Sequence, residues 1–319
     1  MSQRKGFALI AALWFVVLLS GLALEFSLAA HDVRASSINA REEAMARAAA
    51  EAGVDHARAL LSDALRIAAL RDRGAATLLT NSFGDPWRDL EALLRDTVDL
   101  GDQRYVVDLR DVGATLNVNS ATEEELRRLF VALRIDARLA DRFAQTFADW
   151  MDADDLHRAR GAELDAYLRA GAPVLPSNGR FRDAREIRWI LGMTPALFHR
   201  IAPSLSTVGS GRVNLRSASR PVLLALPGMT EEAVSWILRV RREAWRPLDP
   251  GSIYQMLSAS ARAVMLPHLP VLVARTVSST AEVEVRSVGW AENGRVYSRA
   301  SALVVRAGAD MLTSGRRVR

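Results

Sequence analysis

Carboxylate side chains are densest in the middle of the chain. Residues 149–155 read Asp-Trp-Met-Asp-Ala-Asp-Asp, and Glu163 and Asp165 follow shortly after. Hard cations such as calcium take about six to eight oxygen ligands from clustered carboxylates and carbonyls. Paired carboxylates also carry out glycoside hydrolysis, but neither their separation nor a flanking cleft follows from the residues. The run therefore indicates either a cation site or an acidic loop exposed to solvent.

The spacing within this run departs from the EF-hand pattern. Counted from Asp152, residues Asp154 and Glu163 fall on positions three and twelve of a calcium loop. Positions five and six, which require a ligand and a glycine, are Leu156 and His157. The segment is therefore not an EF-hand.

The composition excludes most catalytic chemistry. The 319 residues contain no cysteine, which excludes disulfides, thiol nucleophiles and cysteine-type zinc or iron–sulfur sites. Lys5 is the one lysine among 42 basic residues, so no phosphate-loop or Schiff-base lysine exists beyond that position. The five histidines are scattered without paired ligand spacing, and no Gly-x-Ser-x-Gly elbow occurs. We therefore do not expect an enzyme.

Two short motifs occur twice in the second half of the chain. Residues 116–121 (Leu-Asn-Val-Asn-Ser-Ala) resemble residues 213–218 (Val-Asn-Leu-Arg-Ser-Ala). Gly-Met-Thr occurs at residues 192–194 and again at 228–230. Each motif leads into an apolar helical segment, which indicates an internal helical repeat.

The second repeat resembles a helix-hairpin-helix unit, as in the DNA receptors of competence systems. Such units bind phosphate through backbone N–H groups at a Gly-hydrophobe-Gly turn, helped by nearby arginines. Here the second glycine is Thr230, and Thr194 in the earlier copy, and Glu231 and Glu232 stand where the anion would lie. We therefore expect the repeat to be structural, with DNA binding as the alternative.

The chain begins with an apolar segment. Residues 7–24 carry no charge, and at ~1.5 Å per residue they form about 27 Å of helix, the hydrocarbon thickness of a bilayer. Arg4 and Lys5 precede the segment, which predicts a cytoplasmic N-terminus with the remainder outside. A cleavable secretory signal is the alternative, opposed by the length of the run and by Glu25. We place a transmembrane helix at residues 7–26.

Helix-forming residues continue beyond this segment. Residues 41–61 are rich in alanine and other good helix formers. Their apolar side chains recur every three or four positions, at Ala50, Val54, Ala57, Leu61 and Leu65. A helix from residue 7 to 61 would be about 80 Å long. A lipid-soluble start and an amphipathic end are typical of a filament subunit; a plain membrane anchor followed by an unrelated helix is the alternative.

Strand signals appear in two separated regions. Residues 105–110 alternate between apolar and polar types, and 115–118 predict a second short strand. Residues 282–288 and 295–306 flank an Asn-Gly hairpin turn. Because residues 119–275 read as helical, we expect an α+β fold: one small antiparallel sheet with a large all-α domain inserted in it.

The N-terminal junction resembles the leader of type IV prepilins. Arg4-Lys5-Gly6 precedes Phe7-Ala-Leu-Ile, and in that family a dedicated peptidase cuts after the glycine and the new N-terminal phenylalanine is methylated. The resemblance implies that Gly6 is the cut site and Phe7 the first mature residue. Most pilins have glutamate at the fifth mature position, which is Ala11 here. Its absence is the norm in one subfamily, the minor pseudopilin K of type II secretion systems.

Further motifs in chain order carry the resemblance to that subfamily across nearly the whole chain. They are Ala-Glu-Ala-Gly-Val at 50–54, residues 116–121, the carboxylate run at 149–155, Gly-Ala-Glu at 161–163, Pro-Ser-Asn-Gly-Arg-Phe at 176–181, the Gly-Met-Thr motifs and a C-terminal strand pair. Each motif alone is weak, but their common order is specific. The chain thus resembles the minor pseudopilin K family of the type II (general) secretion pathway.

The resemblance implies a type IV pilin-like fold with a large helical insertion. The predicted organisation is a leader (1–6), a long N-terminal helix (7–75), a first part of the sheet domain (76–118), the inserted helical domain with its repeats (119–275), a second part of the sheet domain (276–310) and a basic tail (311–319).

The resemblance also implies a function and partners. The family caps the pseudopilus tip with minor pseudopilins I and J, above the major pseudopilin, and is processed by the prepilin peptidase. It is anchored in the inner membrane with its C-terminal domain in the periplasm. Family members resemble calcium binders, which we carry onto Asp152, Asp154, Asp155 and Glu163, with Asp149 and Asp165 as further candidates.

The charge balance changes if the leader is removed. The full chain has 42 basic and 37 acidic residues, a formal charge of +5. Loss of Arg4 and Lys5 leaves 40 against 37, or +3, so part of the basic excess is a topology signal.

Two other classes of protein stay open from the residues alone: a membrane-anchored helix-hairpin-helix DNA binder and a calcium-dependent envelope hydrolase.

Overall fold

The computed structural model describes residues 3–70, 94, 96–241, 248–292, 294–308 and 310–318, with side chains of residues 3–11 and 68–70 left aside. The last predicted turn of the long helix (71–75) and the start of the predicted sheet domain (76–93) lie outside the described residues.

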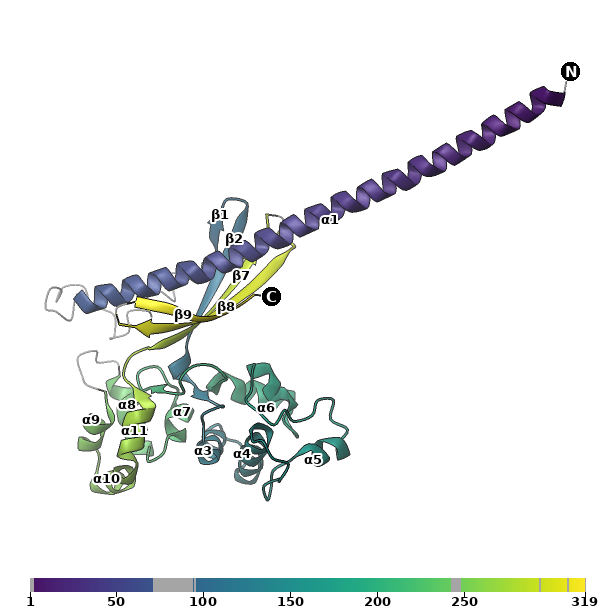
Figure 1. The fold of residues 1–319 in the computed structure, drawn as a ribbon. Coiled ribbons are helices and arrows are strands. Elements are labelled where there is room, and N and C mark those ends of the chain that lie inside the picture. The colour runs from purple at the N-terminus through teal and green to yellow at the C-terminus, as the bar shows by residue number, and fades with distance from the viewer. Residues whose placement is uncertain are drawn as a thin grey trace.

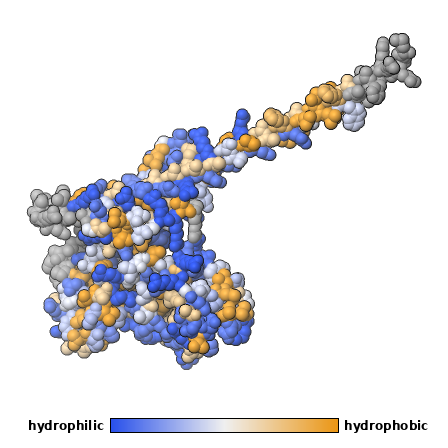
Figure 2. Space-filling view, viewed as in Figure 1, coloured by the Kyte–Doolittle hydropathy of each residue, from blue (hydrophilic) through white to orange (hydrophobic). Residues whose placement is uncertain are grey.

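One helix dominates the N-terminal part of the chain. Helix α1 (Gln3–Leu70) is continuous over 68 residues, which corresponds to about 100 Å, and this confirms the prediction of one long helix. Its N-terminal half projects away from the rest of the molecule (Figure 1), and the described side chains there are mostly apolar and exposed, from Leu13 to Leu24 (Figure 2). Within the described residues, α1 is the one helix long and apolar enough to cross a membrane.

The C-terminal part of α1 packs on a five-stranded sheet. The strand order is β1-β2-β7-β8-β9, all neighbours antiparallel. Their bounds are β1 Val98–Leu100, β2 Gln103–Asp111, β7 Glu282–Trp290, β8 Tyr297–Ala307 and β9 Asp310–Val318. The β7–β8 hairpin confirms the predicted C-terminal strand pair, and the predicted insertion between the two halves of the sheet is also confirmed.

Small residues bring α1 close to the sheet. Ala50, Val54, Ala57 and Leu61 of the predicted apolar stripe are buried in this contact. A Cβ atom added to Gly289 of β7 would lie 2.2 Å from the backbone nitrogen of Ala50. Only glycine therefore permits this approach, which anchors the sheet on the helix.

Two predicted features of the sheet were wrong. Leu116–Asn117 (β3) does not join the sheet but pairs in parallel with β4 (Leu205–Ser206), because the 3-10 turn η2 (Val112–Ala114) leads the chain out of the sheet. The predicted basic tail at 311–319 is instead strand β9 up to Val318, since Met311 is buried against α1 and β8 offers an open edge.

The inserted region consists of short helices around its own apolar core. Its α-helices are α3 Glu123–Ala132, α4 Ala137–Met151, α5 Leu164–Arg169, α6 Pro195–Ile201, α7 Arg220–Ala225, α8 Glu231–Val240, α9 Pro250–Gln255, α10 Ala259–Met265 and α11 Leu269–Arg275. The 3-10 turns are η3 Ala184–Trp189, η4 Ala202–Ser204 and η5 Leu266–His268. The region lies on the side of the sheet away from α1 (Figure 1).

The repeated Asn motifs form equivalent structures. Asn117 in β3 and Asn214 in β5 (Val213–Asn214) each end a parallel two-residue ladder, with β4 and with β6 (Thr276–Val277) respectively. The side-chain oxygen of each asparagine accepts the backbone N–H two residues on, and its carbonyl accepts the N–H four residues on. The sequence echo therefore reflects a structural repeat that leads into α3 and α7.

Candidate metal centre

The end of α4 and the loop that follows bring the carboxylates together. Asp149 lies in the last turn of α4, Asp152 is the C-cap of this helix, and Glu163 directly precedes α5. One carboxylate oxygen from each of these three residues lies within 4.8 Å of the others. Asp149 has no exposed surface and Glu163 is 1% exposed. The cluster is thus a buried acidic triad, which can hold a metal ion.

Arg158 supplies a positive charge to two members of the triad. Its Nη1 donates to Asp149 Oδ1 and to Asp152 Oδ2, each at 2.6 Å. Its backbone N–H also donates to the Asp149 carboxylate at 3.3 Å. The hydrogen bonds to the two aspartates raise the pKa of Arg158 above its usual range, although partial burial opposes this. Arg158 therefore serves as the internal counter-ion of the triad.

Glu163 lacks such compensation. Both of its carboxylate oxygens are buried without a hydrogen-bond partner among the described residues, and so is Asp152 Oδ1. Burial, followed by the charges of Asp149 and other nearby aspartates, raises the pKa of Glu163 to about 7. Buried polar atoms are rarely left unpaired in folded proteins. These orphaned oxygens are what a bound cation would satisfy.

The donor set determines which cation fits. The triad offers only carboxylate oxygens, which suit hard cations such as calcium, magnesium or manganese better than zinc or copper. Calcium takes about six to eight oxygens, so backbone carbonyls or water would complete its shell. Gly161 closes one side of the cluster, since a Cβ atom there would lie 1.8 Å from Asp149 Oδ2.

Buried aromatic rings pack near the triad. Trp150 stacks on Phe181 with 5.6 Å between ring centroids and an interplanar angle of 5°. Trp150 also contacts Tyr167 at 5.8 Å between centroids. All three rings are buried. Burial, and to a lesser extent the charges of Asp149 and Glu163, raises the pKa of Tyr167 to about 12, so this ring lies near the two carboxylates.

The structure brings together only part of the predicted ligand set. Asp152 and Glu163 meet as predicted, and Asp149, a secondary candidate, is the most buried member of the triad. Asp154 and Asp155 are exposed and lie outside this group; they accept hydrogen bonds from the Leu156 backbone and the Asn178 amide. Their part in a metal site stays a prediction.

Asp165, the remaining predicted candidate, lies outside the triad. Asp165 is exposed and pairs with Arg169 at 2.6 Å. Arg158 was missed by the sequence analysis, because nothing in a run of acids marks which arginine will neutralise it. Asp149 had a usable signal: it falls on the buried face of α4, beside Phe147 and Trp150, where an acid is rarely placed without a partner.

The residues of the predicted prepilin junction lie in α1. The backbone of Gly6, Phe7 and Ala11 belongs to this continuous helix, and their side chains are outside the described set. Cleavage after Gly6, methylation of Phe7 and an assembly role of Ala11 therefore stay predictions.

The helix-hairpin-helix-like turns point to structural use. The Thr230 hydroxyl caps α8 by accepting the Ala233 N–H, and Thr194 caps α6 in the same way. A Cβ atom added to Gly228 would lie 2.8 Å from the His268 side chain, so this turn faces the protein. The adjacent Met229 is buried, and its carbonyl accepts from Arg128. This backbone is engaged within the fold rather than presented to phosphate.

The arrangement of the elements defines the fold class. A long apolar-to-amphipathic helix packed on an antiparallel sheet, interrupted between β2 and β7 by a helical region, is a pilin-like fold with an inserted helical region. The same fold occurs in a chain of the crystal structure of the GspK–GspI–GspJ complex of the enterotoxigenic Escherichia coli type II secretion system. The two share a TM-score of 0.63 and 17% identity, over 90% of this chain and 99% of that one.

Sequence comparisons agree on one family. Residues 101–210 match the family described as type II secretion system protein K. Proteins described as type II secretion system protein K from Dickeya chrysanthemi and Pseudomonas aeruginosa are 30% and 31% identical to this chain, over 39% and 35% of it. A putative protein K of Escherichia coli K12 is 24% identical over 78% of the chain. In sequence and in fold, this chain is therefore similar to the protein K family of type II secretion systems.

The matched lengths differ between relatives. The alignments span 36% of the Dickeya protein and 35% of the Pseudomonas protein, about a third of each. The alignment with the K12 protein spans 78% of that relative. The family match at 101–210 contains the whole acidic triad and Arg158.

Proposed function

We propose that this chain is a minor pseudopilin at the tip of a type II secretion pseudopilus, where it helps to start assembly for export of folded proteins from the periplasm. The observation that carries the proposal is the shared fold, which spans 99% of a chain from a GspK–GspI–GspJ complex. The role is structural: the chain provides a shaft, a sheet and a bulky insert rather than a catalytic constellation.

The shape of the subunit supports a terminal position. Helix α1 supplies a shaft whose first half is exposed and apolar, suited to a membrane or to the core of a filament. The inserted region adds a second body on the face of the sheet opposite α1 (Figure 1). Such a body would obstruct a further subunit, and Ala11 in place of glutamate removes the carboxylate that would meet a neighbour's amine.

The proposed topology follows from the same helix. The chain is anchored once in the inner membrane, with residues 1–6 on the cytoplasmic side and the sheet and insert in the periplasm. The prepilin peptidase would cut between Gly6 and Phe7, and Phe7 would then be methylated.

The proposed partners are the minor pseudopilins I and J and the major pseudopilin. The test is co-purification of the full-length chain, tagged after Arg319, with untagged I- and J-type pseudopilins of its own secretion system. We expect a stable complex that contains all three chains. Recovery of the tagged chain alone from membranes that contain both partners would contradict the tip assignment, and recovery with DNA would favour the helix-hairpin-helix alternative.

The proposed metal is calcium, bound structurally by Asp149, Asp152 and Glu163, with Asp154 and Asp155 as peripheral ligands. The support is the pair of orphaned Glu163 oxygens beside the buried Asp149 and the partly exposed Asp152. A bound cation stabilises the folded state in proportion to its concentration over its dissociation constant. Calcium should therefore raise the Tm of the full-length protein in detergent, and should do so much less in Glu163→Gln.

A further inference from the structure

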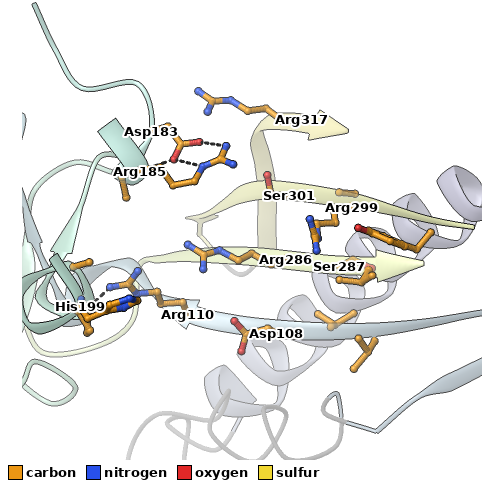
Figure 3. A pocket seen from close by; sticks show the side chains of 18 of the residues that line it. Asp108, Arg110, Asp183, Arg185, His199, Arg286, Ser287, Arg299, Ser301 and Arg317 are labelled. Carbon is orange, nitrogen blue, oxygen red and sulfur yellow. Dashed lines mark hydrogen bonds and ion pairs between the residues drawn. The ribbon is translucent and has the colours of Figure 1, made fainter. Parts of the chain in front are cut away.

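We propose that the cleft between the sheet and the inserted region binds an extended acidic segment of another protein. The cleft has a volume of about 1060 Å³. One wall is the face of β2, β7, β8 and β9 opposite α1, and the other comes from η3 and α6 (Figure 3). Nothing in this inference depends on the tip assignment, because the residues that line the cleft include neither the triad nor the N-terminal junction.

Arginines dominate the charged lining. Five of them, from both walls, face the cleft: Arg110, Arg185, Arg286, Arg299 and Arg317. The acids of the lining are Asp108 and Asp183. Five positive charges against two negative ones leave an excess of three positive charges within one concave surface. Such concave charge concentrates ligands of opposite sign.

Three of the five arginines have no carboxylate partner within the described part of the chain. Arg185 pairs with Asp183 at 2.7 Å and Arg286 with Glu284 at 2.8 Å. Arg110 and Arg317 donate instead to backbone carbonyls of the inserted region. Arg299 lies over the Tyr297 ring, with its guanidinium carbon 5.0 Å from the ring centroid. The guanidinium groups of Arg110, Arg299 and Arg317 therefore retain N–H groups that can donate to carboxylates.

The charge of Arg110 is only partly compensated. Its burial, followed by the nearby positive charge of Arg286, lowers the pKa of Arg110 from its usual range, and the charges of Glu284 and Asp108 offset this only in part. An acidic group in the cleft would add to that offset.

Apolar and aromatic side chains also line the cleft. They include Val106, Val288, Phe198 and Tyr297, beside the polar His199, Ser287 and Ser301. An extended chain places successive side chains on opposite sides, so acids could face the arginines while apolar residues contact this floor. The cleft therefore suits a polypeptide that combines both types of side chain.

The position of the cleft favours a peptide over a membrane. It lies between the sheet and the insert (Figure 3), and the exposed apolar half of α1 projects away from both (Figure 1). A flat lipid surface cannot enter a concave site between two walls. A nucleic acid would use the arginines but not the apolar floor, and this difference makes it a distinguishable outcome.

The experiment measures binding of a fluorescent peptide of alternating glutamate and valine to the full-length chain in detergent. The cleft variant is Arg299→Glu with Arg317→Glu. The control variant is Arg138→Glu with Arg239→Glu, which changes the net charge equally at two exposed positions on the insert. A milder pair, Arg299→Gln with Arg317→Gln, is measured alongside.

We expect the peptide to bind the unaltered chain, less tightly as salt rises, and about tenfold or more weakly in the cleft variant. The control variant should bind like the unaltered chain, and the glutamine pair should fall between. Equal weakening in the cleft and control variants would show that peptide binding depends only on the net charge of the protein, and this would overturn the proposal. Tighter, cleft-dependent binding of a thymidine oligonucleotide or of anionic lipid vesicles would overturn it as well. Co-purification with pseudopilins I and J is measured separately, so failure of either proposal can be told apart.

Discussion

The Arg158 guanidinium lies 2.6 Å from a carboxylate oxygen of Asp149, a side chain with no exposed surface. The same nitrogen is equally close to Asp152. One positive charge is therefore shared between two of the three triad carboxylates, and the third, Glu163, has no such partner. A cation at this site would have to share Asp149 and Asp152 with the arginine or displace it.

Replacement of Arg158 should separate its effect as counter-ion of the triad from its competition with a bound cation. In Arg158→Met, three carboxylates face one another without a counter-ion, so the metal-free protein should lose about 1–3 kcal/mol of stability. Calcium should then raise its Tm by more than in the unaltered chain, because no guanidinium competes for Asp149 and Asp152. The measurement is thermal unfolding with and without calcium.

Arg160→Met is the matched control for that variant. Arg160 lies on the same loop and pairs with Asp141 rather than with the triad. Its calcium response should equal that of the unaltered chain. An Arg158→Met protein with an unchanged calcium response would show that the arginine does not compete with a cation.

The raised pKa of Glu163 predicts a pH dependence of stability. Burial raises its pKa from 4.5 to about 7 in the folded chain without metal. Between these values the unfolded chain has released the proton and the folded chain retains it, so stability falls as pH rises, by at most about 1.4 kcal/mol per pH unit. Above pH ~7 this contribution is constant.

Urea unfolding across that pH range checks the effect. Glu163→Gln should remove this part of the slope, whereas Asp165→Asn, at an exposed neighbouring acid, should keep it. A slope shared equally by the unaltered chain and Glu163→Gln would assign the pH dependence to other groups.

The backbone at Gly161 should be intolerant of a side chain. An added Cβ would lie 1.8 Å from Asp149 Oδ2 and 2.7 Å from its Cγ, and the buried aspartate has nowhere to move. Gly161→Ala should cost about 1–3 kcal/mol and weaken the rise in Tm on addition of calcium. Gly179→Ala, where the added atom meets only Ser177 O at 3.6 Å, should leave both values unchanged. Equal melting of the two variants would contradict the packing of Gly161 on Asp149.

A buried carboxylate fixes the insert to the sheet. Asp111, at the end of β2, accepts from the Asn214 amide at 2.8 Å and from Thr280 at 3.1 Å, and also from Ser217 and the Gly113 N–H. Asp111→Ala leaves several buried donors unpaired and should cost roughly 2–4 kcal/mol. Asp108→Ala, an exposed position on the same strand, is the control.

Limited proteolysis distinguishes loss of the contact between the insert and the sheet from a general loss of stability. If Asp111 holds the two bodies together, Asp111→Ala should be cut first near η2 or between β6 and β7, with the insert released whole. Uniform degradation of the chain would contradict the junction role.

The sequence predicted the elements whose signals are local. The alanine-rich stripe predicted the packed face of α1, and the Asn-Gly turn predicted the β7–β8 hairpin, because periodicity and turn residues act over a few positions. Strand β3 was misplaced, since its partner lies near residue 205 and no local pattern specifies a distant parallel ladder. Strand β9 was not predicted, because the exposed arginines near its end are typical of a charged tail rather than of an edge strand.

The site was harder to predict than the fold. The carboxylate run located the cluster, but the choice of members depends on which side chains the α4 helix turns inward. Asp149 points into the core with Phe147 and Trp150, while Asp154 and Asp155 remain outside on the loop. Arg158 and Gly161 matter only through their positions against Asp149, and spacing along the chain carries no information about such contacts.

The central claim is that this chain is a processed pseudopilin, and the N-terminus of the mature protein tests it most directly. The protein should be isolated from membranes of its own host, with and without the prepilin peptidase, and its first residues determined by N-terminal sequencing and mass spectrometry. The account predicts a mature chain that begins at Phe7 when the peptidase is present and retains residues 1–6 when it is absent. An intact leader in the presence of the peptidase, or a cut near Ala29, would contradict it.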